Sequence, residues 1–192
     1  MRLSPLLVLI AGSLLATSAS AQRPNTRQGF WLSGGLGPGS AGVDCSGCTN
    51  DRTTGLSGNL RLGGTLGGGK FLLGGETNGW VHSESGVDET IGFLSFIFVW
   101  YPSNTGAFFF KLGAGGMRYS ANDGVDELSA TAPSGSVGIG YDFRVGRNVS
   151  LTPYLNALAT SGVDAKFNGQ SIATPVSIKI NLVQLGLAVT MH

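Results

Sequence analysis

Charged residues are scarce in this sequence. Only 12% of its 192 residues are Asp, Glu, Lys or Arg, and 12 basic against 11 acidic side chains leave a net charge of +1. A soluble protein usually carries charge at about 25–35% of its surface positions, so much of this exterior must face something other than water. The chain also lacks the basic stripe of a nucleic-acid-binding protein, and we expect no nucleic-acid partner.

Long apolar runs are absent after the first 21 residues, which argues against a helical membrane protein. The N-terminus itself has a positive charge at Arg2, an apolar run from Leu6 to Leu15, and small residues at Ala19 and Ala21. These are the features of a secretory signal peptide. We therefore expect residues 1–21 to be a signal peptide and residues 22–192 to form one domain.

Cysteine occurs only twice, at Cys45 and Cys48, with two residues between them in a segment rich in turn-forming residues. In an exported chain two such thiols are expected to pair, so we predict a local disulfide that staples a loop. A metal site that also uses Asp44 or Asp51 is an alternative, although two cysteines fall short of the usual four ligands. No motif for a cofactor is present, and we expect none.

Glycine, in contrast, is abundant, with 32 residues and no three-residue period, which argues against collagen and against long helices. From Gly29 onward, segments of about ten residues alternate large apolar side chains with small or polar ones, which is the period of a β-strand. We predict eight strands, at residues 29–37, 55–66, 71–82, 90–101, 107–119, 134–145, 149–160 and 177–191. The last of these changes phase near Leu182, which suggests a bulge.

The predicted connections alternate in length. Short ones lie at residues 67–70, 102–106 and 146–148, and long ones at residues 38–54, 83–89, 120–133 and 161–176. Outer-membrane barrels have short periplasmic turns and longer extracellular loops, and an even number of strands places both termini on the short-turn side. Nine aromatic residues gather near this side, as in an interfacial girdle; they are Phe30, Trp31, Phe71, Trp100, Tyr101, Phe108, Phe110, Tyr141 and Phe143.

Two stretches carry a family resemblance: residues 138–148, which read Gly-Ile-Gly-Tyr-Asp-Phe-Arg-Val-Gly-Arg-Asn, and residues 150–154, Ser-Leu-Thr-Pro-Tyr. Together with the signal peptide and the eight-strand meander, they resemble small outer-membrane barrels of the OmpA/OmpX/OmpW type. The resemblance implies an all-β, eight-stranded antiparallel up-and-down transmembrane β-barrel in the cell outer membrane, with both termini periplasmic. One departure is the final strand, which ends at His192 where such barrels usually end in Phe or Trp.

The scarcity of charge predicts that the apolar face of each strand points outward to lipid and the polar face inward. The interior of an eight-stranded barrel is only wide enough for side chains to fill it, so a general solute pore is not expected. We predict an interior polar network of Asn59, Arg61, Glu76, Asn78, Lys111, Asp142, Arg144 and Tyr154, with Trp31, Ser33, Trp80, His82, Asn156 and Gln184 also facing inward. Interior glycines could still leave a narrow path.

The second and third predicted strands form a hairpin with a short connection at residues 67–70. A four-residue connection pairs Leu66 with Phe71, and stepping back along the strands then pairs Arg61 with Glu76. Directly opposite residues have Cβ atoms roughly 5 Å apart. The register therefore predicts an Arg61–Glu76 salt bridge inside the barrel.

These features predict a structural or surface-interaction role in the outer membrane, without enzymatic activity. Outer-membrane lipid is the expected partner, and the long loops could contact an extracellular ligand or surface. The alternative is a barrel that handles lipid or small molecules, either as a narrow channel or as a hydrolase at the rim. The hydrolase hypothesis depends on residues 82–85, His-Ser-Glu-Ser, because acyl transfer uses a nucleophile, a base and an orienting group. Their spacing departs from the deacylase pattern of His and Ser on one strand face.

Overall fold

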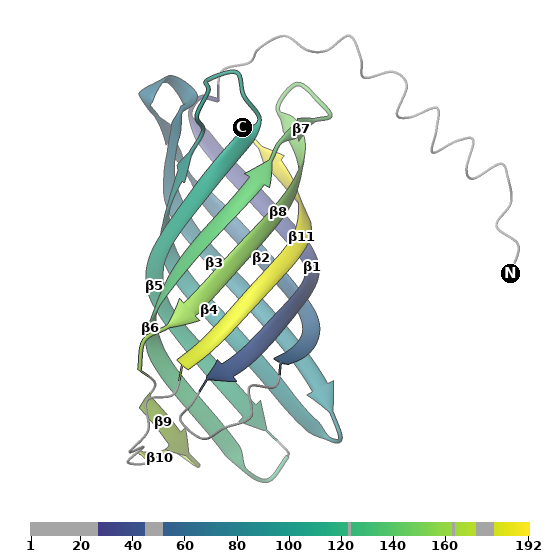
Figure 1. The fold of residues 1–192 in the computed structure, drawn as a ribbon, viewed down its shortest axis with the longest axis vertical. Helices are drawn as coiled ribbons and strands as arrows, with labels where there is room; N and C mark the ends of the chain where they lie inside the picture. The colour runs from purple at the N-terminus through teal and green to yellow at the C-terminus, as the bar shows by residue number, and fades with distance from the viewer. Residues whose placement is uncertain (1–26, 45–51, 123, 163, 172–178) are drawn as a thin grey trace, which may run out of the picture.

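The computed structural model describes residues 27–44, 52–122, 124–162, 164–171 and 179–192, and these form a closed antiparallel β-barrel (Figure 1). Each long strand pairs with its neighbour in the chain, and pairing of β1 with β11 closes the cylinder. The eight long strands are β1 (Phe30–Asp44), β2 (Arg52–Leu66), β3 (Phe71–Glu84), β4 (Val87–Trp100), β5 (Phe108–Asn122), β6 (Glu127–Tyr141), β8 (Val149–Thr160) and β11 (Lys179–Met191).

Three short strands and one turn complete the described part of the chain. β7 (Phe143–Arg144) continues the β6 side of the wall beside β8. At the opposite end, β6 leaves β8 and pairs with β9 (Asp164–Phe167), which in turn pairs with β10 (Gln170–Ser171). The β2–β3 connection is a single 3-10 turn, η1 (Gly67–Gly69), whose three glycines all have positive φ angles of 59°, 64° and 97°. Only glycine adopts this backbone readily, which explains the glycine run at this turn.

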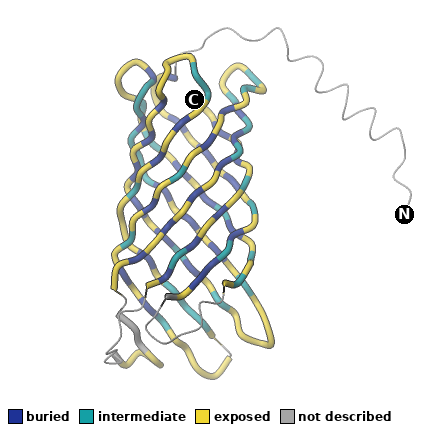
Figure 2. The backbone as a smooth tube through the Cα atoms, in the orientation of Figure 1, coloured by how far each residue is buried: buried dark blue, intermediate teal, exposed yellow. Residues whose placement is uncertain are grey.

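Burial alternates along every long strand, as Figure 2 shows. Large apolar side chains cover the outer surface: Leu36, Leu94 and Leu185 are 66%, 72% and 59% exposed. The polar partners on the other face are buried, with Ser33, Ser57 and Thr152 exposed by no more than 2%. The predicted orientation, apolar side outward, is therefore confirmed. We call the end of the barrel with η1 the turn end and the opposite end the loop end.

The strands are longer than predicted at the loop end. The predicted connection at residues 83–89 is only a two-residue turn at Ser85 and Gly86, whose positive φ angles of 53° and 84° are those of a tight hairpin. The predicted connection at residues 120–133 shrinks to residues 123–126, because β5 and β6 stay paired out to Asn122 and Glu127. The outward positions of these strand ends are polar, as at Thr90, Ser120 and Ser129, and the inward positions mix polar residues with apolar ones such as Ala130. The apolar-outward alternation that marks the other strands is therefore absent there.

The predicted irregularity in the last strand has a different explanation. β11 pairs with β8 residue for residue from Asn181–Ala159 to Met191–Val149, so the predicted bulge near Leu182 is wrong. The change in pattern arises because Ile180 and Leu182 are apolar and yet face the interior. β4 is apolar on both faces for the same reason.

Apolar side chains fill two layers of the interior. A turn-end cluster contains Trp31, Leu72, Ile97, Val99, Tyr101 and Phe109. A loop-end cluster is built around Trp80, Ile91, Phe93, Met117, Leu158, Ile180 and Leu182. Trp31 and Tyr101 are therefore interior residues and not part of the predicted girdle, because they are 3% and 2% exposed. The other girdle aromatics face outward, and pairs such as Trp100 and Phe110 stack with ring centroids 5.6 Å apart.

Within the described residues, no helix is long and apolar enough to cross a membrane.

Candidate functional site: the barrel interior

An ion cluster crosses the lumen between the two apolar layers. β2 and β3 pair in the predicted register, with Arg61 opposite Glu76, because the short η1 turn sets the alignment of the hairpin. Arg61 Nε donates to Glu76 Oε1 at 2.6 Å. Lys111 reaches the same carboxylate from β5, and its Nζ lies 2.6 Å from Oε1 and 2.5 Å from Oε2. All three residues are at most 3% exposed, so the cluster is sealed from solvent.

The charges of this cluster do not balance. Two cations share one carboxylate, which leaves a local charge of +1. The guanidinium of Arg61 also lies over the ring of Tyr154, with its Cζ atom 5.1 Å from the ring centroid. Such a contact stabilises a desolvated cation through the electron-rich face of the ring. Each member therefore depends on the others, because a buried charge that loses its partner is costly.

Amides surround the ion cluster. Asn59 stands directly opposite Asn78 on the β2–β3 pair, one inward position closer to the loop end than Arg61 and Glu76. Asn156 of β8 donates its Nδ2 hydrogen to Gln184 Oε1 of β11 at 3.4 Å. The predicted interior residues Asn59, Arg61, Glu76, Asn78, Lys111, Asp142 and Tyr154 are all buried in the structure, and Arg144 is half-buried in β7.

Interior glycines make room for these side chains and do not line an open path. A Cβ atom added at Gly138 would lie 2.3 Å from Asn156 Oδ1 and 3.2 Å from Lys111 Cε. At Gly186 it would lie 2.4 Å from the Tyr154 hydroxyl oxygen, and at Gly140 it would lie 2.3 Å from Phe109 Cζ. The space that these three glycines leave is thus filled by a neighbouring side chain.

A second polar group lies at the turn end, around Asp142. Its carboxylate accepts hydrogen bonds from the Tyr101 hydroxyl at 2.8 Å and the Thr152 hydroxyl at 2.7 Å. Arg27 Nε and His192 Nε2 lie 3.8 Å and 3.5 Å from Asp142 Oδ2. Arg27, which precedes β1, also places its guanidinium 3.5 Å from the centre of the Tyr101 ring. Asp142 thus belongs to a group separate from the Arg61 cluster.

The Asp142 group extends across the junction of the first and last long strands. The Thr152 and Thr190 hydroxyls lie 2.9 Å apart, and Thr190 contacts Ser33 of β1 at the same distance. Sequence reasoning missed Arg27 and Tyr101 as members of an interior site. Strand alternation places Thr152 and Thr190 on the inner face, but Arg27 precedes the first strand and has no such signal.

The rim residues at 82–85 do not form a catalytic arrangement. His82 points inward, stacks on Trp80 with ring centroids 5.9 Å apart, and lies 3.3 Å from Glu84. Ser83 is the next residue along β3, so its side chain points to the other face, where its hydroxyl donates to Asp88 Oδ1 at 2.6 Å. Strand geometry therefore separates the candidate nucleophile from the candidate base.

Two sequence predictions fall outside the described residues: the signal peptide at residues 1–21 and the disulfide between Cys45 and Cys48. No group of three or more His, Cys, Asp or Glu side chains within the described part of the chain could hold a metal ion.

The fold has known counterparts, although sequence comparison finds none: no protein-family model and no curated protein matches the chain. The crystal structure of Neisserial surface protein A is similar with a TM-score of 0.59 at 15% identity, covering 84% of this chain and 96% of that one. Ail, the attachment invasion locus protein of Yersinia pestis, is similar with a TM-score of 0.57 at 13% identity, covering 86% and 100%. The chain therefore has the fold of the small eight-stranded outer-membrane barrels.

Proposed function

We propose that this protein is an integral outer-membrane barrel with a plugged lumen and a structural or surface-interaction role. The observation that carries the proposal is the filled interior. The Arg61–Glu76–Lys111 cluster lies between two apolar layers, and the members of all three layers are nearly inaccessible to solvent. A solute that crossed the lumen would have to displace all three layers.

The outer surface supports the membrane placement. A belt of exposed Leu, Val, Ile and Phe surrounds the barrel, and outward aromatic residues gather at its turn end, as in outer-membrane barrels. We place the turn end in the periplasm, because β1 begins and β11 ends there and the connections at this end are short. The loop end, where β9 and β10 extend the wall (Figure 1), then faces outward.

Two partners follow from this placement: lipid around the belt, and an extracellular ligand or surface at the loop end. The structural similarity to Ail is compatible with an extracellular ligand or surface as a partner, since the name of Ail describes attachment and invasion. The alternatives gain no comparable support. A narrow channel would have to pass the ion cluster, and a rim hydrolase would need Ser83 on the same face as His82.

The test combines location with conductance. We expect the protein in the outer-membrane fraction, with different gel mobility before and after boiling, because closed barrels resist detergent unfolding. The purified barrel in a planar bilayer should give no conductance above baseline, and glycine substitution of Arg61, Glu76 and Lys111 together should raise it. A soluble periplasmic protein would contradict the membrane placement, and steady conductance by the unaltered barrel would contradict the plugged lumen.

Two further parts of the proposal concern residues outside the described chain. We propose that residues 1–21 are removed on export, so that the mature protein begins at Gln22, and that Cys45 and Cys48 form a disulfide. N-terminal sequencing of the membrane-inserted protein tests the first. A thiol reagent should add no mass to the denatured, unreduced protein, whereas two labels per chain would contradict the disulfide.

A further inference from the structure

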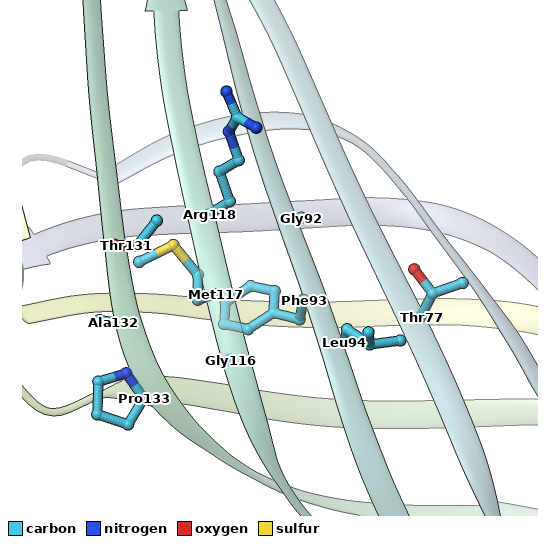
Figure 3. Close-up of a pocket in the computed structure, with 10 residues that line it drawn as sticks. All are labelled: Thr77, Gly92, Phe93, Leu94, Gly116, Met117, Arg118, Thr131, Ala132 and Pro133. Carbon is cyan, nitrogen blue, oxygen red and sulfur yellow. The ribbon is translucent and has the colours of Figure 1, made fainter. Parts of the chain in front are cut away.

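A groove of about 590 Å³ lies on the outer surface of the barrel, toward the loop end of β3, β4, β5 and β6 (Figure 3). Gly92 and Gly116 form its floor, and Leu94 and Pro133 stand on either side. Arg118 and Thr131 lie at its loop-end margin. The groove is shallow and open along the outer wall, so a ligand lying in it would keep one side exposed.

The groove exists because glycine occupies positions 92 and 116, although the backbone there would accept larger residues. A Cβ atom added at Gly92 would meet nothing within 4 Å, and one added at Gly116 would meet only Ala132 O, at 3.9 Å. Neither glycine has a positive φ angle. A side chain would fit at both positions, unlike at the interior glycines, which are in close contact with their neighbours. The two glycines keep an outward hollow open at the edge of the apolar belt.

Arg118 gives this hollow one charged end. Its side chain is exposed and extends along β5 toward the loop end, beyond Gly116 (Figure 3). Arg118 pairs laterally with Gly92 and Thr131. Of the acidic positions around it, Asp164 of β9 stands opposite Thr131, two strands away from Arg118, and Asp88 and Glu127 lie four positions further toward the loop end on β4 and β6. With a rise of about 3.4 Å per residue and a tilt of about 40°, the Cα atoms of Asp88 and Glu127 lie about 10 Å from that of Arg118 along the barrel axis.

Asp88 and Glu127 also have other partners. Asp88 accepts a hydrogen bond from Ser83, and Glu127 accepts one from Ser120. Among the described residues, no carboxylate forms an ion pair with Arg118. In a membrane, Arg118 would be an unpaired cation at the depth of the lipid headgroups. A guanidinium binds phosphate through two parallel hydrogen bonds, so a phosphate-bearing lipid supplies the missing anion.

We propose that the groove binds one lipid with an anionic phosphate headgroup. Its acyl chain lies over Gly92 and Gly116 between Leu94 and Pro133, and its phosphate accepts hydrogen bonds from Arg118. The inference rests on the proposed membrane placement and adds to it a defined lipid site on one face of the barrel.

The test measures lipid binding to the refolded full-length mature barrel by native mass spectrometry, with phosphatidylglycerol titrated into phosphatidylcholine nanodiscs. Arg118→Gln removes the charge, and Gly116→Leu fills the groove while keeping the charge. The matched controls are Lys179→Gln, which removes a cation from the exterior of the loop end, and Gly64→Leu, which adds a side chain to the outer face where a Cβ meets nothing within 4 Å. We expect each groove variant to bind phosphatidylglycerol about tenfold more weakly, equivalent to about 1.4 kcal/mol, and each control to stay within about twofold.

Several outcomes would overturn the inference. Undiminished binding by Gly116→Leu would show that the charge acts without the groove, and equal loss in Lys179→Gln would show general surface electrostatics. Competition by inorganic phosphate as strong as that by the lipid would make the acyl chain irrelevant, and a dimer that excludes lipid would assign the groove to a second copy. Gel mobility before and after boiling is measured for every variant. A barrel that fails to insert contradicts the proposed function, whereas an inserted barrel without lipid preference contradicts only this inference.

Discussion

Neutralising Glu76 should destabilise the barrel more than neutralising either of its cationic partners. In Glu76→Gln, the carboxylate that both Arg61 and Lys111 contact is lost, and two buried cations remain without an anion. Breaking a buried ion pair from one side typically costs about 3–5 kcal/mol. Removing one cation instead, by Arg61→Gln or Lys111→Met, leaves a neutral pair with short hydrogen bonds. The loss is then closer to that of one charge-assisted hydrogen bond, about 1.5–3 kcal/mol.

The double variant Arg61→Gln with Glu76→Gln gives a sharper test. It leaves Lys111 as one unpaired cation in place of the two that remain in Glu76→Gln, so part of the lost stability should return. The coupling energy between the two sites should exceed the roughly 0.5 kcal/mol that is expected of independent positions. Lys111 limits the recovery, because its ammonium group contacts only Glu76 among the described residues.

The assay is urea unfolding of the refolded barrel in phospholipid vesicles, followed by tryptophan fluorescence. Trp31 and Trp80, 3% and 1% exposed, lie in the apolar layers on either side of the cluster and report its environment. Glu127→Gln, at the exposed start of β6, is the control and should change the unfolding free energy by less than about 0.5 kcal/mol. If Glu76→Gln is no more destabilising than Lys111→Met, the lumen is wet enough to screen these charges, and the argument for a sealed plug fails.

Three other changes test the remaining parts of the structure. Leu185→Arg, on the exposed belt, should cost about 2–4 kcal/mol in vesicles if this position faces the membrane midplane, and an unchanged unfolding midpoint would contradict lipid exposure. Gly138→Val should lower the unfolding free energy by about 1–3 kcal/mol in the same assay, because its Cβ would overlap Asn156. Gly75→Ala, where an added Cβ meets nothing within 4 Å, should change the unfolding free energy little, and equal effects of the two changes would contradict the packed interior. Asp142→Asn should cost about 2–3 kcal/mol through weaker bonds to its hydroxyl and cationic partners, and a neutral result would show that this group does not stabilise the turn end.

Much of the fold can be predicted from the sequence, because a period of two along eight segments defines the strands and the scarcity of charge defines which face points outward. The β2–β3 register could also be predicted, since a short turn aligns Leu66 with Phe71 and every later pair follows. The loop-end extensions could not be predicted from alternation. There, beyond the apolar belt, the outward positions are polar and the inward ones are mixed, and the strands continue through backbone hydrogen bonds without the alternation that marks them in the belt.

The candidate site, like the fold, could be predicted only in part. The Arg61–Glu76 pair follows from a local hairpin, but Lys111 approaches from β5, 35 residues away from Glu76 and on the far side of β4. Which side chains meet across a barrel depends on the stagger and tilt of all its strands, and alternation along a single strand contains no such information. Asp142 was predicted to face the interior, but its partner Arg27 was missed for a similar reason, since Arg27 precedes the first strand and reaches Asp142 only after the barrel has closed.

The two interior polar groups stabilise different parts of the closed barrel. The Arg61–Glu76–Lys111 cluster joins β2, β3 and β5, which lie on one side of the wall. The Asp142 group joins the turn after β6 to β8, β11 and β1 through Thr152, Thr190 and Ser33, and so spans the junction that closes the cylinder. Hydrogen bonds of the first group can form as soon as neighbouring hairpins assemble, whereas those of the second need β1 beside β11. The turn end is therefore held shut by side-chain contacts that exist only in the closed barrel.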